Sequence, residues 1–389
     1  MALLYFLVVL ATTRTKMPRV SFAGLLVGES LRLAMFACLD GWVLTGLLVV
    51  TSLAPVPELL RRNQSPRLYL LHMALFAGLL VGGMLAVEAG AVTAGSVLLV
   101  GAVLVRSGVF PAHLWIPDLF ERASFATALL TVVPIVGVYA GLRLVLPVAP
   151  DAVLRGIGAV SLGTALYSAG MAVVQTDARR FFAYLLLSHA SLVLVGLELH
   201  TLLSMTGALC LWFSVMLSLG GLGLTLRALE SRFGRMSLSE YHGLFDASPE
   251  LAVCFLLTGL ASVGFPGTLG FISAELLVDG TVEANLLLGV AVVLAAAING
   301  IAIVRAYFLL FTGRRHEPSF PLAITPRERV AVLTLAALIF GGGLAPQPGV
   351  RTRYRAAAEI LAARGEPAPA DHEGEGHAEH RLGDLFSLK

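Results

Sequence analysis

The run EANLLLGVAVVLAAAINGIAIVRAYFLLF, residues 283–311, decides the fold class of this protein. A helix that crosses a bilayer needs ~20 mostly apolar residues. Between Glu283 and the end of this run the only charged residue is Arg305. Because lipid offers no partner to a free backbone group, such a run must pair its backbone internally, as a helix. The run therefore predicts a transmembrane helix.

Similar apolar runs continue in both directions along the chain. Nine more lie at 38–57, 66–87, 91–110, 123–147, 151–174, 180–199, 201–226, 250–278 and 328–346. Met1–Thr13 is apolar but short, and no A-x-A-like cleavage pattern follows it, so we interpret it as a retained first span. The alternating strands of a membrane barrel are absent. The sequence thus predicts an all-α membrane protein with about eleven transmembrane helices, ten of them clear.

Three parts are expected: an N-terminal segment 1–37 with a short first span, a transmembrane bundle 38–346, and a soluble C-terminal tail 347–389. Within the tail, Tyr354–Arg364 has the pattern of a short amphipathic surface helix. The remainder is acidic and carries histidines at positions 372, 377 and 380. Such an ending can capture a metal ion, but a solvated end is the simpler interpretation.

The composition excludes several classes of protein. Only 13% of the residues are charged and 57% are hydrophobic, whereas soluble domains are about a quarter charged and disordered chains have low hydrophobicity. The net charge of +2 is too small to indicate a nucleic-acid partner. Cys38, Cys210 and Cys254 lie far apart in apolar stretches, so neither a zinc nor an iron–sulfur site is indicated.

Arginines mark alternate loops between the predicted spans, and the loops between them are nearly free of arginine. The marked loops carry Arg61, Arg62 and Arg67; Arg179 and Arg180; Arg227, Arg232 and Arg235; and Arg314, Arg315, Arg327 and Arg329. By the positive-inside rule we place this set in the cytoplasm. The basic residues of the two termini do not follow the same rule, so the terminal topology stays open.

Prolines inside the spans predict helix breaks. Pro111 would free the carbonyl of Ser107, and Pro134 that of Leu130. Gly264–Gly270 contains Pro266, Gly267 and two further glycines, so we expect two half-helices joined by an unwound stretch. Interrupted helices of this kind are typical of ion-translocating proteins.

Ionisable residues at membrane depth are the candidate functional residues. Glu275, after the break, is the best candidate for a buried carboxylate, and His189 for a proton relay. The simpler interpretation of His189 is a core histidine bonded to a neighbouring hydroxyl. Arg106 is either functional or interfacial, and Arg305 either pairs with a carboxylate or marks the cytoplasmic edge. Glu88 and Glu198 lie near the ends of predicted spans, so we interpret both as residues at the membrane boundary.

Nothing in the sequence indicates a cofactor or a catalytic centre. There is no GxxxxGK[ST] motif, the glycines have no βαβ context, and no catalytic triad or zinc-hydrolase motif is present. Gly-rich runs such as 341–343 are better explained by close helix packing.

Three ordered motifs nevertheless resemble one family. They are FPAHLWIPD at 110–118, DARRFFAY at 177–184 with SHA at 188–190, and GFPGTLGFISAE at 264–275. They are similar to segments of the proton-conducting antiporter-like membrane subunits found in respiratory complex I, membrane-bound hydrogenases, Mrp-type antiporters and DAB-type inorganic-carbon uptake systems. The resemblance implies two inverted five-helix repeats, each with a broken helix, and a buried chain of titratable residues. It also adds His113 to the pathway candidates.

The chain departs from that family pattern at its lysines. The family's lysine before the first motif falls at Arg106, which keeps its proton and can act only as a fixed field. The lysine after the next proline falls at Ile135, and a third falls near Ser214 or Met216. The glutamate-bearing helix that pairs with the first lysine has no evident counterpart here.

Three functions remain open from the sequence. We favour a proton-translocating, or cation-translocating, subunit of a larger energy-coupling complex in a bacterial or archaeal cytoplasmic membrane, with conduction through the later half of the bundle. The second is a non-conducting scaffold that anchors a soluble partner. The third, a standalone cation/proton antiporter, is disfavoured because hard cations require several oxygen ligands.

The expected partner is equally open. The resemblance implies either a redox module, as in an NADH:quinone oxidoreductase-like or hydrogenase-like translocase, or a zinc-bearing subunit of a DAB-type carbon-uptake complex. In either case any catalytic centre lies in another subunit.

Overall fold

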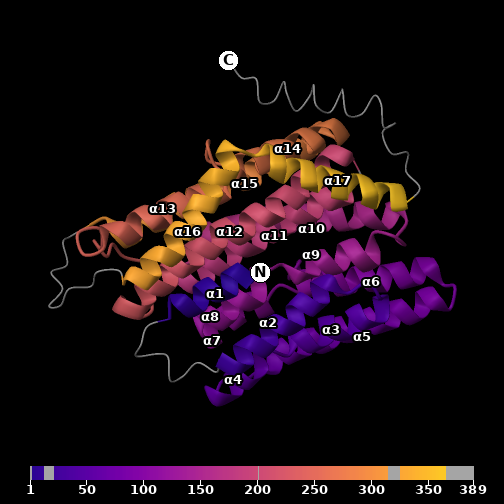
Figure 1. The fold of residues 1–389 in the computed structure, drawn as a ribbon, viewed down its shortest axis with the longest axis horizontal. Coiled ribbons are helices and arrows are strands. Elements are labelled where there is room, and N and C mark those ends of the chain that lie inside the picture. The colour runs from indigo at the N-terminus through magenta and orange to yellow at the C-terminus, as the bar shows by residue number, and fades with distance from the viewer. Residues whose placement is uncertain (1, 13–21, 200, 314–324, 365–389) are drawn as a thin grey trace.

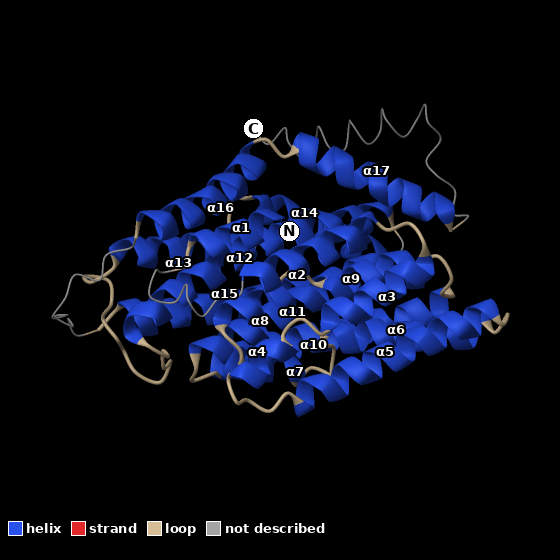
Figure 2. Cartoon of the chain, turned by 60° about the horizontal axis from the view of Figure 1, so that its bottom comes forward, coloured by secondary structure: helices blue, strands red, loops and turns tan. Residues whose placement is uncertain are grey.

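The computed structural model describes residues 2–12, 22–199, 201–313 and 325–364, and every named element in these ranges is a helix (Figure 2). The all-α prediction is confirmed. The helices are α1 (Ala2–Leu10), α2 (Phe22–Ala37), α3 (Gly41–Ser52), α4 (Val56–Arg61), α5 (Arg67–Glu88), α6 (Val92–Ser107), α7 (Trp115–Arg122), α8 (Phe125–Val132), α9 (Val136–Ala140) with a π-helical turn (Gly141–Val145), α10 (Asp151–Val174), α11 (Ala178–Glu198), α12 (Leu202–Phe233), α13 (Pro249–Ser262), α14 (Leu269–Ala284), α15 (Leu286–Phe311), α16 (Pro326–Leu344) and α17 (Gln347–Ala363).

Helices α10, α11 and α12 run through the middle of the molecule, with α3, α5 and α6 on one side and α13, α15 and α16 on the other (Figure 1). Nearly every residue of α11 is buried. By contrast, the outer faces of α5 and α15 expose large apolar side chains such as Leu71 and Val290. A bundle that is apolar outside as well as inside matches lipid as its solvent.

Seven helices among the described residues are long and apolar enough to cross a membrane, or eight if α16 and α17, bent by 79°, form one span. This is fewer than the eleven spans expected. The difference has a physical cause: the run at 91–110 forms only the 16-residue α6, the run at 250–278 is divided between α13 and α14, α1 has only nine residues, and α16 ends in the sharp bend. The sequence located the apolar runs, but a run is not always one helix.

The helix breaks lie at the predicted prolines. The chain is non-helical from Gly108 to the turn before α7, around Pro134, and between α13 and α14. Positive φ angles of 88° and 81° at Gly264 and Gly267 make the last break, and glycine adopts them without a steric penalty. Ile135, directly after Pro134, has φ of 47°, which is strained for a β-branched residue.

The arginine-bearing turns meet at one end of the bundle, as predicted. Arg179 of α11 binds both carboxylate oxygens of Glu230 in α12, at 2.5 and 2.6 Å. Arg232 binds Glu328 at the start of α16 in the same bidentate way. Paired guanidinium–carboxylate forks of this kind hold two elements in a fixed orientation.

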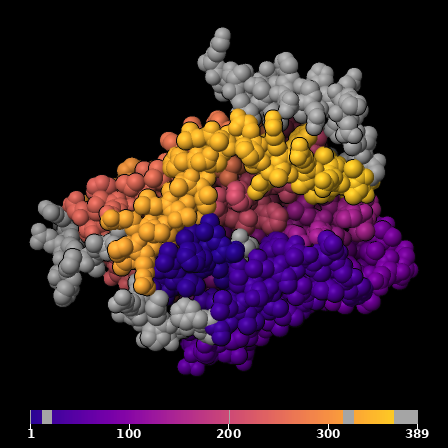
Figure 3. Space-filling model, viewed as in Figure 1, coloured from indigo at the N-terminus to yellow at the C-terminus, as the bar shows by residue number. Residues whose placement is uncertain are grey.

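Both flanking segments lie against the bundle. Arg227 of α12 donates to Val8 O at the end of α1, at 2.8 Å, and Arg32 of α2 reaches the centre of the molecule. Helix α17 crosses the outside of α12 and ends where Arg364 donates to Leu146 O and pairs with Asp151 (Figures 1 and 3). The expected surface helix is therefore longer than 354–364 and ties the two halves together. The histidine-bearing stretch 371–380 lies outside the described residues.

Candidate functional site

His189 lies at the centre of the molecule, against the end of a broken helix. Its Nε2 is 2.9 Å from Ser262 O, the last carbonyl of α13, and its Nδ1 is 2.8 Å from Leu185 O, one turn earlier in α11. Only 2% of the residue is exposed. The break around Pro266 thus leaves a carbonyl unpaired in its own helix, and His189 binds it.

This arrangement supports proton movement at the ring. A neutral imidazole donates through one nitrogen and an imidazolium through both, and here a carbonyl acceptor faces each nitrogen. Either tautomer keeps one hydrogen bond, and the protonated ring makes two. A cavity of about 30 Å³ adjoins the ring, bounded by Ser262, Ala274 and Val292 among others. Its volume is large enough for one water molecule, for which His189 and Ser262 are the polar residues of an otherwise apolar lining.

A polar contact links α10, α11 and α15 one residue before His189. Asn299 of α15 donates to Ser188 Oγ at 2.9 Å, and Ser188 donates to Ala165 O of α10, also at 2.9 Å. The Oδ1 atom of Asn299 is buried and has no hydrogen-bond partner among the described residues, and the same is true of Ser191 Oγ. Buried polar groups are nearly always paired, so these orphans mark a place where water or a moving proton can be accommodated.

His113 lies in a separate aromatic cluster. Its Nε2 is 3.4 Å from Tyr167 OH of α10, and its ring lies 5.6 Å from Phe110 and 6.3 Å from Tyr184. The Nδ1 atom is buried without a partner in the described chain. Within the described part of the chain, no hydrogen bond connects this cluster to His189, so the structure does not bring the two candidate histidines together.

The first half of the bundle contains two buried arginines. Arg106 at the end of α6 is 4% exposed, lies 5.4 Å from the Trp115 ring, and makes no ion pair with any described residue. Arg32 of α2 is 2% exposed and donates to Leu130 O at 2.5 Å. Leu130 O is the carbonyl that Pro134 was predicted to free. The interfacial interpretation of Arg106 is therefore wrong, because its side chain is enclosed by the bundle.

Two charged residues of this half with buried polar atoms, Glu29 and Arg32, come from α2, and the sequence analysis did not identify them. Glu29 lies three residues before Arg32, within electrostatic range of Arg32 and Tyr5, and both of its carboxylate oxygens are buried without a hydrogen-bond partner in the described residues. Glu29 is therefore a buried carboxyl group that the sequence analysis did not single out, but it is no ion-pair partner of Arg106, the position of the family's first lysine, among the described residues. The segment GESLRL at 28–33 held the signal, since two charges in an otherwise apolar stretch indicate an inward face.

Glu275 does not occupy the buried position expected of it. The buried face of α14 is formed by Leu269, Gly270, Ser273, Leu276, Leu277, Gly280 and Thr281. Glu275 lies off that face and is only partly buried, next to the exposed Asp279. Ala274, one residue earlier, takes the place beside the His189 cavity.

The remaining two candidates, Arg305 and Glu88, make hydrogen bonds near the ends of helices. Arg305 donates to Gln175 O and Leu238 O, both at 3.3 Å, so it marks the arginine-bearing edge and does not pair with a carboxylate. Glu88, at the last position of α5, is exposed and accepts a hydrogen bond from the Trp42 indole of α3.

Glu198, which the sequence assigned to a span boundary, is a buried carboxyl group of this half, and unlike Glu328 it has no arginine partner among the described residues. It is 5% exposed, and neither carboxylate oxygen has a hydrogen-bond partner among the described residues. Its Oε2 packs so closely against α10 that a Cβ added to Gly158 would lie 2.9 Å away. Glu198 and His189 are nine residues apart on the same helix, about 13 Å along its axis.

No group of three histidine, cysteine, aspartate or glutamate side chains in the described ranges is arranged to hold a metal ion.

The family follows from a direct comparison. Residues 4–299 match the family model described as "NADH:quinone oxidoreductase/Mrp antiporter, TM". The chain belongs to this family. Relatives include subunit M of NADH-quinone oxidoreductase from Mycobacterium tuberculosis, 28% identical over 69% of this chain and 50% of the relative, and subunit M of F(420)H(2) dehydrogenase from Methanosarcina mazei, 30% identical over 63% and 51%. The chain thus spans about half the length of these curated relatives.

Solved structures show the same fold. A chain of respiratory complex I from Thermus thermophilus superposes with a TM-score of 0.79 at 23% identity, over 93% of this chain and 83% of that one. A chain of the Mrp complex from Dietzia sp. gives 0.77 at 17% identity, over 88% and 79%. This protein is therefore a multi-pass membrane member of the antiporter-like family.

Proposed function

We propose that this protein translocates protons as a membrane subunit of a larger energy-coupling complex, in the cytoplasmic membrane of a bacterium or archaeon. Support comes from the family, whose relatives are named as subunits of NADH-quinone oxidoreductase and F(420)H(2) dehydrogenase. It also comes from a bundle with interrupted helices and protonatable groups at their ends.

The observation that carries this proposal is His189. A buried imidazole with a carbonyl acceptor at each nitrogen and space for water beside it can receive a proton at one nitrogen and release one from the other. Glu198, further along α11, is the carboxyl group that exchanges protons toward the opposite end from the arginines.

In this proposal the first half of the bundle has a different role. Arg32 and Arg106 are fixed positive charges that do not release protons, and they are buried where a cation would have to pass. Conduction therefore uses α10, α11, α13 and α15, and the arginines repel protons and cations from the α6–α9 region.

The scaffold function is the second candidate, and one observation favours it. His189, His113 and Glu29 lie in three clusters, and no hydrogen bond between described residues leads from one to the next. In a scaffold these groups would stay dry and conduct nothing.

The deciding experiment is proton flux into liposomes containing the full chain with the subunits that co-purify with it. His189→Ala is expected to lower flux by about tenfold or more, because it removes the hydrogen bond from α11 to the carbonyl freed at the break, Ser262 O. His72→Ala is the matched control, because His72 Nδ1 likewise lies 2.9 Å from the carbonyl oxygen one turn earlier, Leu68 O, but on the outer helix α5. Unchanged flux in His189→Ala would establish the scaffold function.

We also propose the class of its partner. Either an iron–sulfur or flavin module or a zinc-bearing subunit of a carbon-uptake complex should co-purify with the chain. Metal and flavin analysis of the purified complex distinguishes them.

A further inference from the structure

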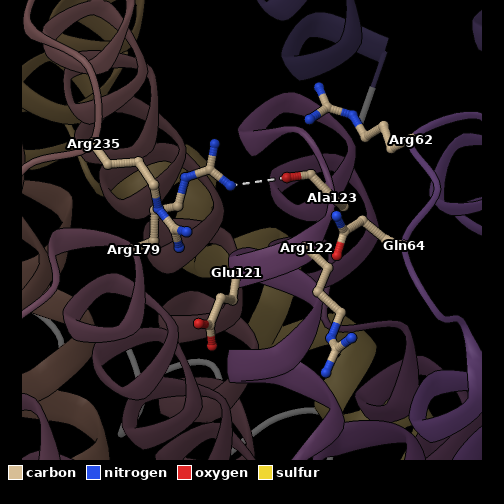
Figure 4. A pocket seen from close by; sticks show the side chains of 7 residues that line it. All are labelled: Arg62, Gln64, Glu121, Arg122, Ala123, Arg179 and Arg235. Carbon is tan, nitrogen blue, oxygen red and sulfur yellow. Dashed lines mark hydrogen bonds between the residues drawn. The ribbon is translucent and has the colours of Figure 1, made fainter.

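A polar pocket opens at the arginine-bearing end of the bundle. Its volume is about 400 Å³, and it is lined by Arg62, Gln64, Glu121, Arg122, Ala123, Arg179 and Arg235 (Figure 4). These residues come from the turn after α4, the end of α7, the start of α11 and the loop after α12. Four guanidinium groups and one carboxylate thus surround the hollow.

One arginine builds the wall of this pocket. Arg179 is 9% exposed, donates to Phe120 O and Ala123 O at 2.6 and 2.8 Å, and pairs with Glu230. Its donors are directed at these protein partners, so it fixes the end of α7 against α11.

The other three arginines have donors to spare. Arg62, Arg122 and Arg235 approach a carboxylate most closely through Nε, at 2.9, 2.6 and 3.8 Å. No hydrogen bond from their terminal Nη groups to a described residue is found. Their acidic partners, Glu58, Asp118 and Asp177, do not line the pocket. The carboxylates outside the pocket therefore orient these side chains through Nε, while the terminal Nη groups can still donate to a ligand in the pocket.

We propose that this pocket binds the phosphate of an anionic phospholipid headgroup. Guanidinium groups from three separate elements match a tetrahedral oxyanion better than a planar carboxylate, which is satisfied by a single fork. The pocket lies where apolar helices end, at the level of headgroups, and basic pockets between membrane helices at a cytoplasmic face bind such lipids. The bound lipid would join α4, α7 and α11 at the end where Arg305 and Arg232 also act.

The test uses the full chain with its co-purifying subunits in nanodiscs of phosphatidylcholine, with and without phosphatidylglycerol. Native mass spectrometry is expected to show retained phosphatidylglycerol. The triple variant Arg62→Gln/Arg122→Gln/Arg235→Gln should weaken that retention by about tenfold or more. Arg61→Gln/Arg327→Gln/Arg329→Gln, which removes three exposed charges from the same end, should retain it.

A second variant and a second ligand test the same pocket. Glu121→Gln removes the one lining carboxylate and also frees Arg180, which lies 3.8 Å from that carboxylate. Both changes make the pocket more positive, so the variant should strengthen retention. Equal retention in the wild type and the triple variant, or weaker retention in Glu121→Gln, overturns the proposal. It is also overturned if inorganic phosphate occupies the pocket while phosphatidylglycerol does not, or if an acidic segment of a partner subunit fills it.

Discussion

Arg32 shows how a single side chain compensates for a helix break. Pro134 has no N–H to donate, so it frees the carbonyl of Leu130, and in lipid that group needs another partner. Arg32 of α2 supplies it, and the Trp212 indole donates to the carbonyl of Pro134 itself at 3.0 Å. The break is held open by donors from two other helices.

The first prediction follows from this contact. Arg32→Leu keeps the apolar volume but leaves Leu130 O buried without a donor, which should destabilise the protein by about 1–3 kcal/mol. Unfolding in detergent micelles measures the change. Arg155→Leu, on the exposed face of α10, is the control and should change stability by less than about 0.5 kcal/mol. Equal stability of the two variants would contradict the role assigned to Arg32.

Individual residues were the hardest feature to predict from sequence. The carbonyl freed by Pro134 could be derived from the chain alone, but its partner is 98 residues away in a segment that was expected to stand apart from the bundle. Glu275 was expected inside because it follows the break, yet one helical residue rotates a side chain by about 100°, and Ala274 faces the cavity instead. Glu198 looked like a boundary residue because hydropathy reports depth and not which neighbours enclose a side chain.

At the scale of elements, the break between α13 and α14 depends on close backbone contact. Gly270, in the first turn of α14, lies so near α13 that an added Cβ would be 1.8 Å from Ala261 O. The end of α13 that binds His189 is therefore held against the start of α14.

Gly270→Ala should accordingly separate the two half-helices and displace Ser262 O from His189. We expect destabilisation of about 2 kcal/mol or more, in the range of overpacked core substitutions, together with reduced proton flux. Gly300→Ala is the matched control, since its nearest neighbour would be Val263 Cγ2 at 3.9 Å, and helix propensity there favours alanine by up to about 1 kcal/mol. If Gly270→Ala is as stable as Gly300→Ala, the tight junction is not required.

The elements themselves were predicted well where one apolar run forms one helix. The runs at 66–87, 151–174 and 283–311 match α5, α10 and α15 closely. The breaks were also predictable, because proline and clustered glycine act locally. The number of spans is less predictable, because tertiary contacts decide whether two half-helices form one span, as in α16–α17.

At the scale of the whole molecule, α17 packs across the outside of the later half and reaches the segment between α9 and α10, and we call it the strap. It leaves α16 at the sharp bend, places the Arg353 guanidinium 4.5 Å from the Phe213 ring of α12, and ends at Asp151 at the start of α10. Its last residues thus bind the loop that precedes α10.

Arg364→Met should loosen this strap without unfolding the bundle. It removes the hydrogen bonds to Leu146 O and Ala149 O and the ion pair with Asp151. Hydrogen–deuterium exchange should therefore be faster in α17 than in the wild type, while α11 stays protected. Arg355→Met, an exposed arginine of the same helix, should leave α17 unchanged. Equal protection of α17 in both variants would mean that Arg364 does not fasten it.

In the proposed account, Arg32 and Arg106 are fixed charges buried in the first half, and His189 and Glu198, the proposed proton-exchanging groups, lie together on α11. The measurement that tests this most directly is proton flux in the reconstituted complex for His189→Ala/Glu198→Gln, compared with Glu88→Gln/Glu275→Gln. We predict that the first variant falls to the leak of protein-free liposomes and that the second stays within about twofold of the wild type. Wild-type flux in the first variant, or loss of flux only in the second, would contradict conduction along α11.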